Sequence, residues 1–193
     1  MKKGPMGAIK RVFGTLVFAT CLILVTGIFS VPTALAKTAK EINSEVDAAV
    51  ELFLQHVKGG KEFLHAAKGV LVIPNIVKAG VGVGGEYGEG AMRIGGKTVE
   101  YYGIAAGSVG FQIGAQKANL ILVFKQDGAL NNFRKSSGWK AGVDGSVAFI
   151  DVGAEKSLDT INIKDPIVAF MYGQRGLMAS ATIEGAKFTK LVR

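Results

Sequence analysis

Glycine is the residue that most constrains this fold, because 23 of the 27 glycines lie beyond residue 36. Many of them gather in three tracts, residues 79–85, 105–114 and 141–147, where glycine is interleaved mainly with small residues. Glycine weakens the interior of a strand unless the backbone has to bend, bulge or approach another backbone closely. We therefore expect tightly packed, strongly curved strands, as in a small barrel or a closed sandwich.

The first 36 residues have the layout of a secretory signal peptide. Four basic residues and no acidic residue open the chain, and an apolar run follows over residues 12–31. Pro32 and an Ala-Leu-Ala sequence ending at Ala36 then supply the small residues that signal peptidase requires. An uncleaved anchor is the alternative, since the run is about long enough to span a bilayer. We favour cleavage after Ala36, which makes residues 1–36 a signal peptide and residues 37–193 the mature domain.

Removal of this segment changes the charge and the chemistry of the chain. The formal net charge falls from +8 to +4, and the single cysteine, Cys21, is lost. The mature domain can then form no disulfide and has no thiol nucleophile or Cys-ligated metal. Export, a modest charge and the lack of an aromatic stacking platform also argue against nucleic acid as a partner.

The pattern of apolar residues predicts helices first and strands afterwards. Spacings of three and four residues indicate a helix over residues 38–57, ended by Gly59-Gly60, and a short helix over residues 61–67. The polar face of the first helix is acidic, so we expect this helix to pack on the sheet and not to contact a membrane. A further helix, capped by Asp127, is expected over residues 127–136.

Strands are expected from Gly69 onwards, with Gly95-Gly96 as a two-residue hairpin turn. The predicted strands span residues 70–73, 77–94, 98–114, 120–125, 143–152, 167–172 and 177–183. The fold class is therefore α+β, with N-terminal helices packed on a strongly curved antiparallel sheet that is closed or nearly closed.

No motif in the chain carries recognisable catalytic, metal or cofactor chemistry. The G-x-G-x-x-G pattern that starts at Gly80 is not followed by a helical sequence, which argues against a nucleotide site. His56 and His65 lack neighbours at a metal-ligand spacing. Glu86 and Glu89 would face opposite sides of a strand, which suits structural hydrogen bonds better than paired-carboxylate catalysis. We expect no enzyme activity and no cofactor.

The segment from Arg134 to Lys140 is the best candidate for a binding surface. Arg134, Lys135 and Lys140 can pair with phosphate groups, and Trp139 has a side chain suited to the bilayer interface. The alternative is a tryptophan buried in the core beside a solvated turn. Three lysines after the first helix are placed to help a membrane contact: Lys58, Lys61 and Lys68.

Five segments of the chain resemble the SYLF-domain proteins, a lipid-binding, YSC-type actin-binding-like family. The matching segments are residues 68–74, 78–90, 136–146, 176–179 and 183–187. The resemblance extends from about Ser44 to the C-terminus and is closest to exported bacterial members. It implies a phospholipid-binding module without enzymatic activity. Eukaryotic members bind phosphoinositides and are tied to actin, and they use a basic amphipathic N-terminal segment, whereas the corresponding helix here is acidic.

These observations predict a non-catalytic protein that binds anionic phospholipid at a membrane surface. We expect it in the periplasm or secreted, peripherally associated with the membrane, with no nucleotide or nucleic acid partner. One alternative is a structural or partner-binding envelope protein with an apolar groove for a partner or an acyl chain. The other is a hydrolase with dispersed catalytic residues.

Overall fold

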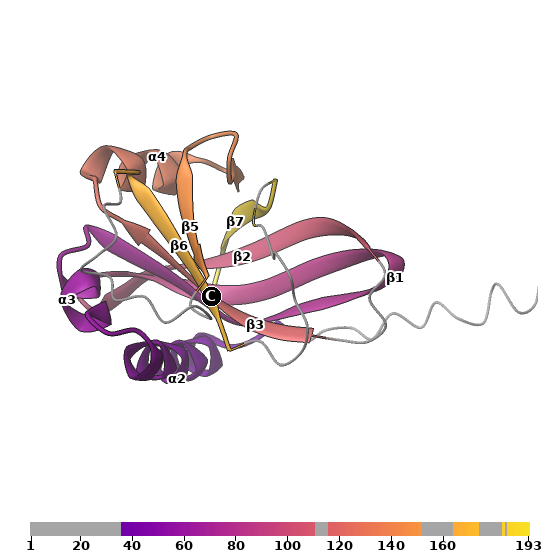
Figure 1. Ribbon diagram of the computed structural model, residues 1–193, viewed down its shortest axis with the longest axis horizontal. Coiled ribbons are helices and arrows are strands. Elements are labelled where there is room, and N and C mark those ends of the chain that lie inside the picture. Colours follow the sequence, from indigo (N-terminus) through magenta and orange to yellow (C-terminus); the bar gives the residue numbers. More distant parts are fainter. Residues whose placement is uncertain (1–35, 111–115, 152–163, 174–182, 184) are drawn as a thin grey trace, which may run out of the picture. The chain divides into compact units, whose positions relative to one another are not determined.

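Strands make up about half of the residues that the computed structural model describes, which are 36–110, 116–151, 164–173, 183 and 185–193. The helices in these ranges are α2 (Ala39–His56), α3 (Gly60–His65) and α4 (Asp127–Lys135). The strands are β1 (Gly69–Ile94), β2 (Lys97–Gly110), β3 (Gln116–Phe124), β4 (Trp139–Lys140), β5 (Val147–Asp151), β6 (Ile167–Tyr172) and β7 (Lys187–Leu191) (Figure 1). The predicted α+β class is confirmed.

The described strands form one mixed sheet in the order β4-β7-β2-β1-β3-β6-β5, which curls as a half-barrel. All pairings between these strands are antiparallel, as predicted, except that of β5 with β6, which is parallel and makes the sheet mixed. A parallel pair needs a long crossover connection. Residues 152–166, between β5 and β6, are long enough to provide it.

Strand β1 supplies two neighbouring arms of the sheet and explains why glycine is needed at position 90. Its residues 69–78 pair with β3 and its residues 82–94 pair with β2, and the arms run side by side (Figure 1). A Cβ atom at Gly90 would collide with the carbonyl oxygen of Val72 and lie 2.7 Å from the Cα atom of Ile73. Glycine is therefore required here because one backbone crosses close to another.

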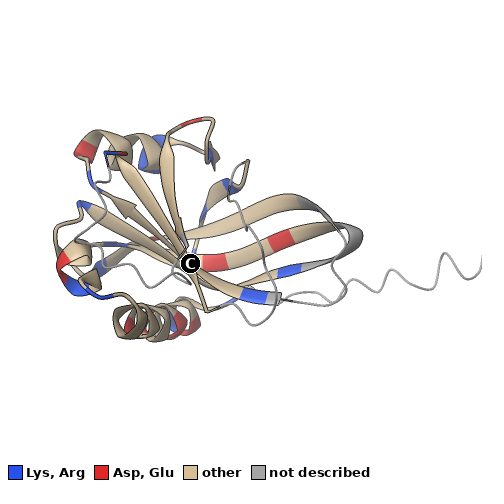
Figure 2. Cartoon of the chain, viewed as in Figure 1, with Lys and Arg blue, Asp and Glu red and all other residues tan. Residues whose placement is uncertain are grey.

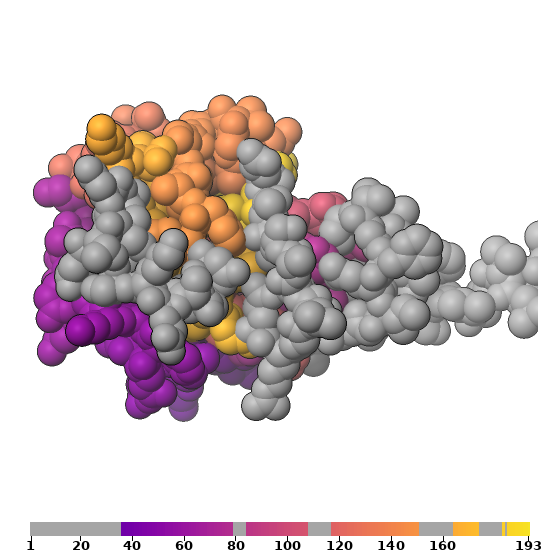
Figure 3. Space-filling model, in the orientation of Figure 1, coloured from indigo at the N-terminus to yellow at the C-terminus, as the bar shows by residue number. Residues whose placement is uncertain are grey.

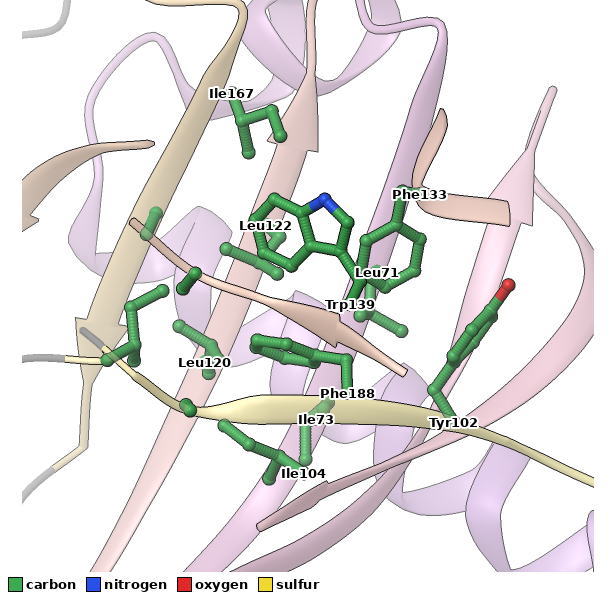
Figure 4. Packing of buried hydrophobic residues seen from close by; sticks show 14 of the residues in the cluster. Leu71, Ile73, Tyr102, Ile104, Leu120, Leu122, Phe133, Trp139, Ile167 and Phe188 are labelled. Atoms are coloured by element: carbon green, nitrogen blue, oxygen red, sulfur yellow. The ribbon is translucent and has the colours of Figure 1, made fainter. Parts of the chain in front are cut away.

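The sheet has a hydrophobic core on each face, as expected for a two-sided layer structure. On the face covered by α4, Phe133 packs against four aromatic rings at centroid distances of 4.9–5.8 Å. These rings belong to Tyr102, Phe124, Trp139 and Phe188. Figure 4 shows three of them: Tyr102, Trp139 and Phe188. All buried hydrophobic residues described lie between positions 42 and 188, and residues 37–193 group into one unit.

Helix α2 covers the other face, as its amphipathic pattern predicted. Thr38 and Glu41 form a reciprocal capping box at its start. Its buried side is formed by Ile42, Val46, Ala49 and Phe53. The hydroxyl of Tyr172 in β6 donates a hydrogen bond of 2.7 Å to the carbonyl of Ala49. Figure 3 shows α2 and α3, in indigo and purple, gathered along one side of the molecule.

Several predicted boundaries differ from the structure. Pro74 does not end a strand, since β1 continues through it. Asp127 is the first residue of α4 and not its cap; the cap position belongs to Gln126, which makes no side-chain capping bond. The predicted strand over residues 177–183 lies almost wholly outside the described residues, as does the apolar run over residues 12–31. No helix among the described residues is long and apolar enough to cross a bilayer.

Replacement of Gly90 by valine tests the close approach within β1. Gly90→Val should lower the free energy of unfolding by at least about 2 kcal/mol, because the added side chain would overlap the Val72 carbonyl. Urea denaturation of residues 37–193 measures the change. Gly107→Ala is the control, since a Cβ atom there meets nothing within 4 Å. Equal stability of the two variants would contradict the packing described here.

Candidate functional site

Trp139 lies in the core, where its side chain is only 2% exposed. It pairs with Phe188 of β7, and the ring centroids of Trp139 lie 5.2 Å from Phe133 and 5.8 Å from Phe188. Successive residues of a strand point to opposite faces, so this pairing turns Trp139 inward and Lys140 outward. The prediction that the indole ring reaches a bilayer is wrong, and the alternative of a buried tryptophan is correct.

The outward side of the same strands carries a row of four exposed residues from four neighbouring strands. In register across the sheet, Tyr87 of β1 lies opposite Ala105 of β2, which lies opposite Lys187 of β7, which lies opposite Lys140 of β4. Directly paired residues share one face of a sheet. We call Tyr87, Ala105, Lys187 and Lys140 the cross-strand row; it lies on the α2 face, and all four are exposed.

The two lysines of the row are directly opposed like charges. Such pairs destabilise a sheet unless another charge compensates them. No carboxylate of the described residues lies within 4.0 Å of either ammonium group. Asp144 accepts a hydrogen bond from the backbone N–H of Lys140 at 2.7 Å, and the stem of Lys187 passes over Gly138. The row therefore presents two fixed positive charges to solvent.

Tyr87 places an aromatic ring at the other end of the row and is 52% exposed. Its hydroxyl donates to Glu89 Oε1 at 2.6 Å, and Arg193 Nη2 donates to the same oxygen at 2.8 Å. Burial alone would raise the pKa of Glu89, but the bonds from Tyr87 and Arg193 outweigh it and lower that pKa. Glu89 is therefore a buried carboxylate with its charge matched by Arg193, and it orients Tyr87.

Arg134 belongs to a different cluster, on the α4 face. Glu100 accepts two bonds of 3.0 Å from Arg134, one of 2.6 Å from Lys190 and one of 2.7 Å from the hydroxyl of Tyr102. Burial raises the pKa of Glu100, but these donors together lower it to about 2. Arg134 and Lys140, predicted to share one surface, thus lie on opposite faces of the sheet. Lys135 is exposed at the end of α4 and forms no ion pair with the described residues.

The other predicted lysines lie around α3, away from the row. Lys58 and Lys61 are exposed, and Lys68 makes a loose contact of 3.8 Å with the exposed carboxylate of Asp127. Figure 2 shows that acidic as well as basic residues surround this helix. The structure therefore does not join these three lysines to Lys135 and Lys140 in one positive surface.

The groups considered for catalysis make structural contacts. Lys78 pairs with Glu86 at 2.7 Å, and His56 and His65 each bond to a carbonyl four residues earlier in their helices. Within the described ranges there is no cluster of three or more potential metal-ligating His, Cys, Asp or Glu residues. The G-x-G-x-x-G pattern lies inside β1, without the following helix that a dinucleotide site needs.

The described residues form an α+β domain whose outer sheet face carries the cross-strand row. Residues 105–191 match the family model of Ysc84, described as a Las17-binding protein actin regulator. This match supports the resemblance to the SYLF-domain family seen in the sequence. The family is one of binding domains and not a known enzyme family. A search of curated proteins found no match.

Sequence reasoning missed Tyr87 and Lys187 as candidate site residues. The alternation of polar and apolar residues from Lys187 to Thr189 is a short strand signal that would have placed Lys187 and Phe188 on opposite faces. Its position opposite Lys140 depends on the pairing of β4 with β7, which joins segments far apart in the chain. That register is visible only in the structure.

The Glu100 cluster should govern part of the acid sensitivity of the fold. Because the folded-state pKa of about 2 lies below the ordinary value of 4.5, Glu100 contributes stability that is complete above pH 4.5 and is lost as the pH falls towards 2. Glu100→Gln should lower stability at pH 7 and flatten its decline between pH 4.5 and 2. Urea denaturation across this pH range measures it. Asp127→Asn, at an exposed carboxylate, is the control; a slope like that of the wild type in Glu100→Gln would contradict the assignment.

Proposed function

We propose that this chain is a non-catalytic, peripheral binder of anionic phospholipid surfaces, and that the cross-strand row forms the contact. The single observation that carries the proposal is the direct opposition of Lys140 and Lys187 without a carboxylate partner among the described residues. The match to a family associated with lipid and actin-related binding supports it.

The row has the composition that a headgroup region favours. Lysine ammonium groups pair with phosphate as point charges, and each basic residue near an anionic membrane contributes about 1 kcal/mol. Tyrosine is enriched at membrane interfaces, where its ring is apolar and its hydroxyl stays hydrated. Tyr87 takes over the interfacial role first assigned to Trp139. Ala105, small and exposed between Tyr87 and Lys187, leaves the exposed ring of Tyr87 and the side chain of Lys187 uncovered, while the Tyr87 hydroxyl stays bonded to Glu89.

The remaining predicted residues contribute unequally. Lys135, Lys58 and Lys61 stay candidates because their exposed charges add to the attraction towards an anionic surface. Arg134 forms an ion pair with Glu100, and Lys68 forms one with Asp127, so we expect both to contribute less to the attraction towards an anionic surface. Helix α2 lies on the same face of the sheet as the row, and its exposed carboxylates would repel an anionic surface, so we place the contact on the part of this face that the helix leaves uncovered.

We further propose that residues 1–36 direct export and that the mature protein begins at Lys37, in the periplasm or outside the cell. The basic start, apolar run and Ala-Leu-Ala sequence support this. Intact-mass measurement and N-terminal sequencing of the protein recovered from an expressing bacterium should give Lys37 as the first residue. A product that retains residues 1–36 would favour the anchor alternative.

Vesicle co-sedimentation of residues 37–193 tests the membrane contact. Binding should rise with the fraction of anionic phospholipid and fall with salt, because the attraction is electrostatic. The double substitution Lys140→Glu and Lys187→Glu should weaken binding at least about 30-fold, since it removes two contributions of about 1 kcal/mol and adds repulsion.

The matched control carries the same charge change at two other exposed lysines, Lys40→Glu and Lys117→Glu. If both double variants lose affinity equally, the net charge and not the row governs binding. If the wild-type domain does not bind anionic vesicles at all, the alternative of a partner-binding protein without lipid contact is favoured.

A further inference from the structure

A second candidate site lies apart from the cross-strand row. A cavity of about 430 Å³ opens between α2, α3, the start of β1 and the β1–β2 turn. None of the four residues of the row lines it. Its volume falls within the range of about 300–1,000 Å³ that is usual for small-molecule sites.

The wall of this cavity is mainly aliphatic. Its apolar side chains come from three successive elements of the chain: Val50, Leu54, Leu64, Ala67, Val70 and Val72. Leu54 is 39% exposed at the opening of the cavity. Polar residues are more usual at such exposed positions. Gly95 and Gly96 form another part of the wall, and a Cβ atom at either would meet nothing within 4 Å, which leaves that side open.

The polar side chains at the cavity are basic or neutral. Lys61 and His65 of α3 and Arg93 of β1 line it, and none of the lining residues is acidic. His65 Nδ1 bonds to the carbonyl of Lys61, which leaves Nε2 without a partner among the described residues. The cavity therefore combines an aliphatic wall with basic side chains, of which Lys61 has no ion-pair partner among the described residues and Arg93 is paired with Asp47.

Arg93 lines this site with a guanidinium group that is paired with Asp47. One of its terminal nitrogens bonds to Asp47 at 2.7 Å, and its side chain is 18% exposed. Its Nε atom is buried and so does not face the cavity. Arg93 therefore contributes to the site through the exposed part of its side chain.

We infer that this cavity binds one acyl chain that ends in an anionic headgroup. The aliphatic wall would hold the hydrocarbon, and Lys61, Arg93 and His65 would face the carboxylate or phosphate at the rim. The charge at the rim selects against a cationic headgroup, and the lack of further polar side chains selects against a sugar or nucleotide. This site would hold a single lipid molecule, whereas the cross-strand row would meet a surface.

Titration calorimetry of residues 37–193 with dodecanoate and dodecyl phosphate, below their micellar concentrations, tests the inference. One molecule per chain should bind in each case, and decanoate should bind more weakly than dodecanoate by about fourfold per methylene. Dodecyltrimethylammonium should not bind measurably. Binding of dodecyl phosphate but not dodecanoate would assign the headgroup to a phosphate, and the reverse result would assign it to a carboxylate.

Leu54→Glu should weaken binding of the anionic chain at least tenfold, because it places a carboxylate at the apolar rim. Val143→Glu introduces the same group at an exposed valine in the loop between β4 and β5 and should bind as the wild type does. If Leu54→Glu unfolds, as its thermal transition would show, Lys61→Glu on the exposed side of α3 replaces it. Absence of saturable binding, equal binding of the cationic amphiphile, or unchanged affinity in the folded rim variant would overturn the proposal.

Discussion

The pairing of β4 with β7 is the constraint on which the outer surface depends. Trp139 and Phe188 lie opposite each other and pack with Phe133, burying three aromatic rings together. Because the side-chain period of a strand is two, this inward pair fixes the outward pair of Lys140 and Lys187. The energy that stabilises the core thus also holds two like charges together that would otherwise separate. Trp139 is buried and does not form part of the surface, but its packing fixes the positions of the two lysines.

Two carboxylates secure the sheet around this pair without cancelling its charge. Glu100 gathers Arg134, Lys190 and Tyr102 on the α4 face, and so joins α4, β2 and β7. On the α2 face, Glu89 is matched by Arg193 and holds Tyr87 in place. The charged residues of this region therefore fall into two groups: those in structural ion pairs, and the two lysines of the cross-strand row, which have no carboxylate partner among the described residues. A simple count of basic residues along the segment from Arg134 to Lys140 cannot separate these two groups.

The local sequence pattern was sufficient to predict the helices, the α+β class and the family resemblance. It was insufficient to predict the candidate site. The apolar periodicity of α2 and the Gly95-Gly96 turn depend on neighbours in the chain, so the sequence predicted both. The parallel pairing of β5 with β6 and the register of Lys187 depend on long-range contacts, which leave no local signal. The composition of Trp139 and its basic neighbours suited a membrane and a core equally well, and only the pairing with Phe188 decided between them.

The order of pairing along the chain has a consequence for how the outer surface comes into being. The centre of the sheet joins segments that are near in sequence, β1 with β2 and with β3, whereas β7 meets β2 across more than 80 residues. Pairings that close long loops cost more chain entropy than local ones. Because β7 reaches β2 only through such a pairing, a chain in which β1, β2 and β3 alone have paired has much of the sheet but lacks the opposed lysines of the row.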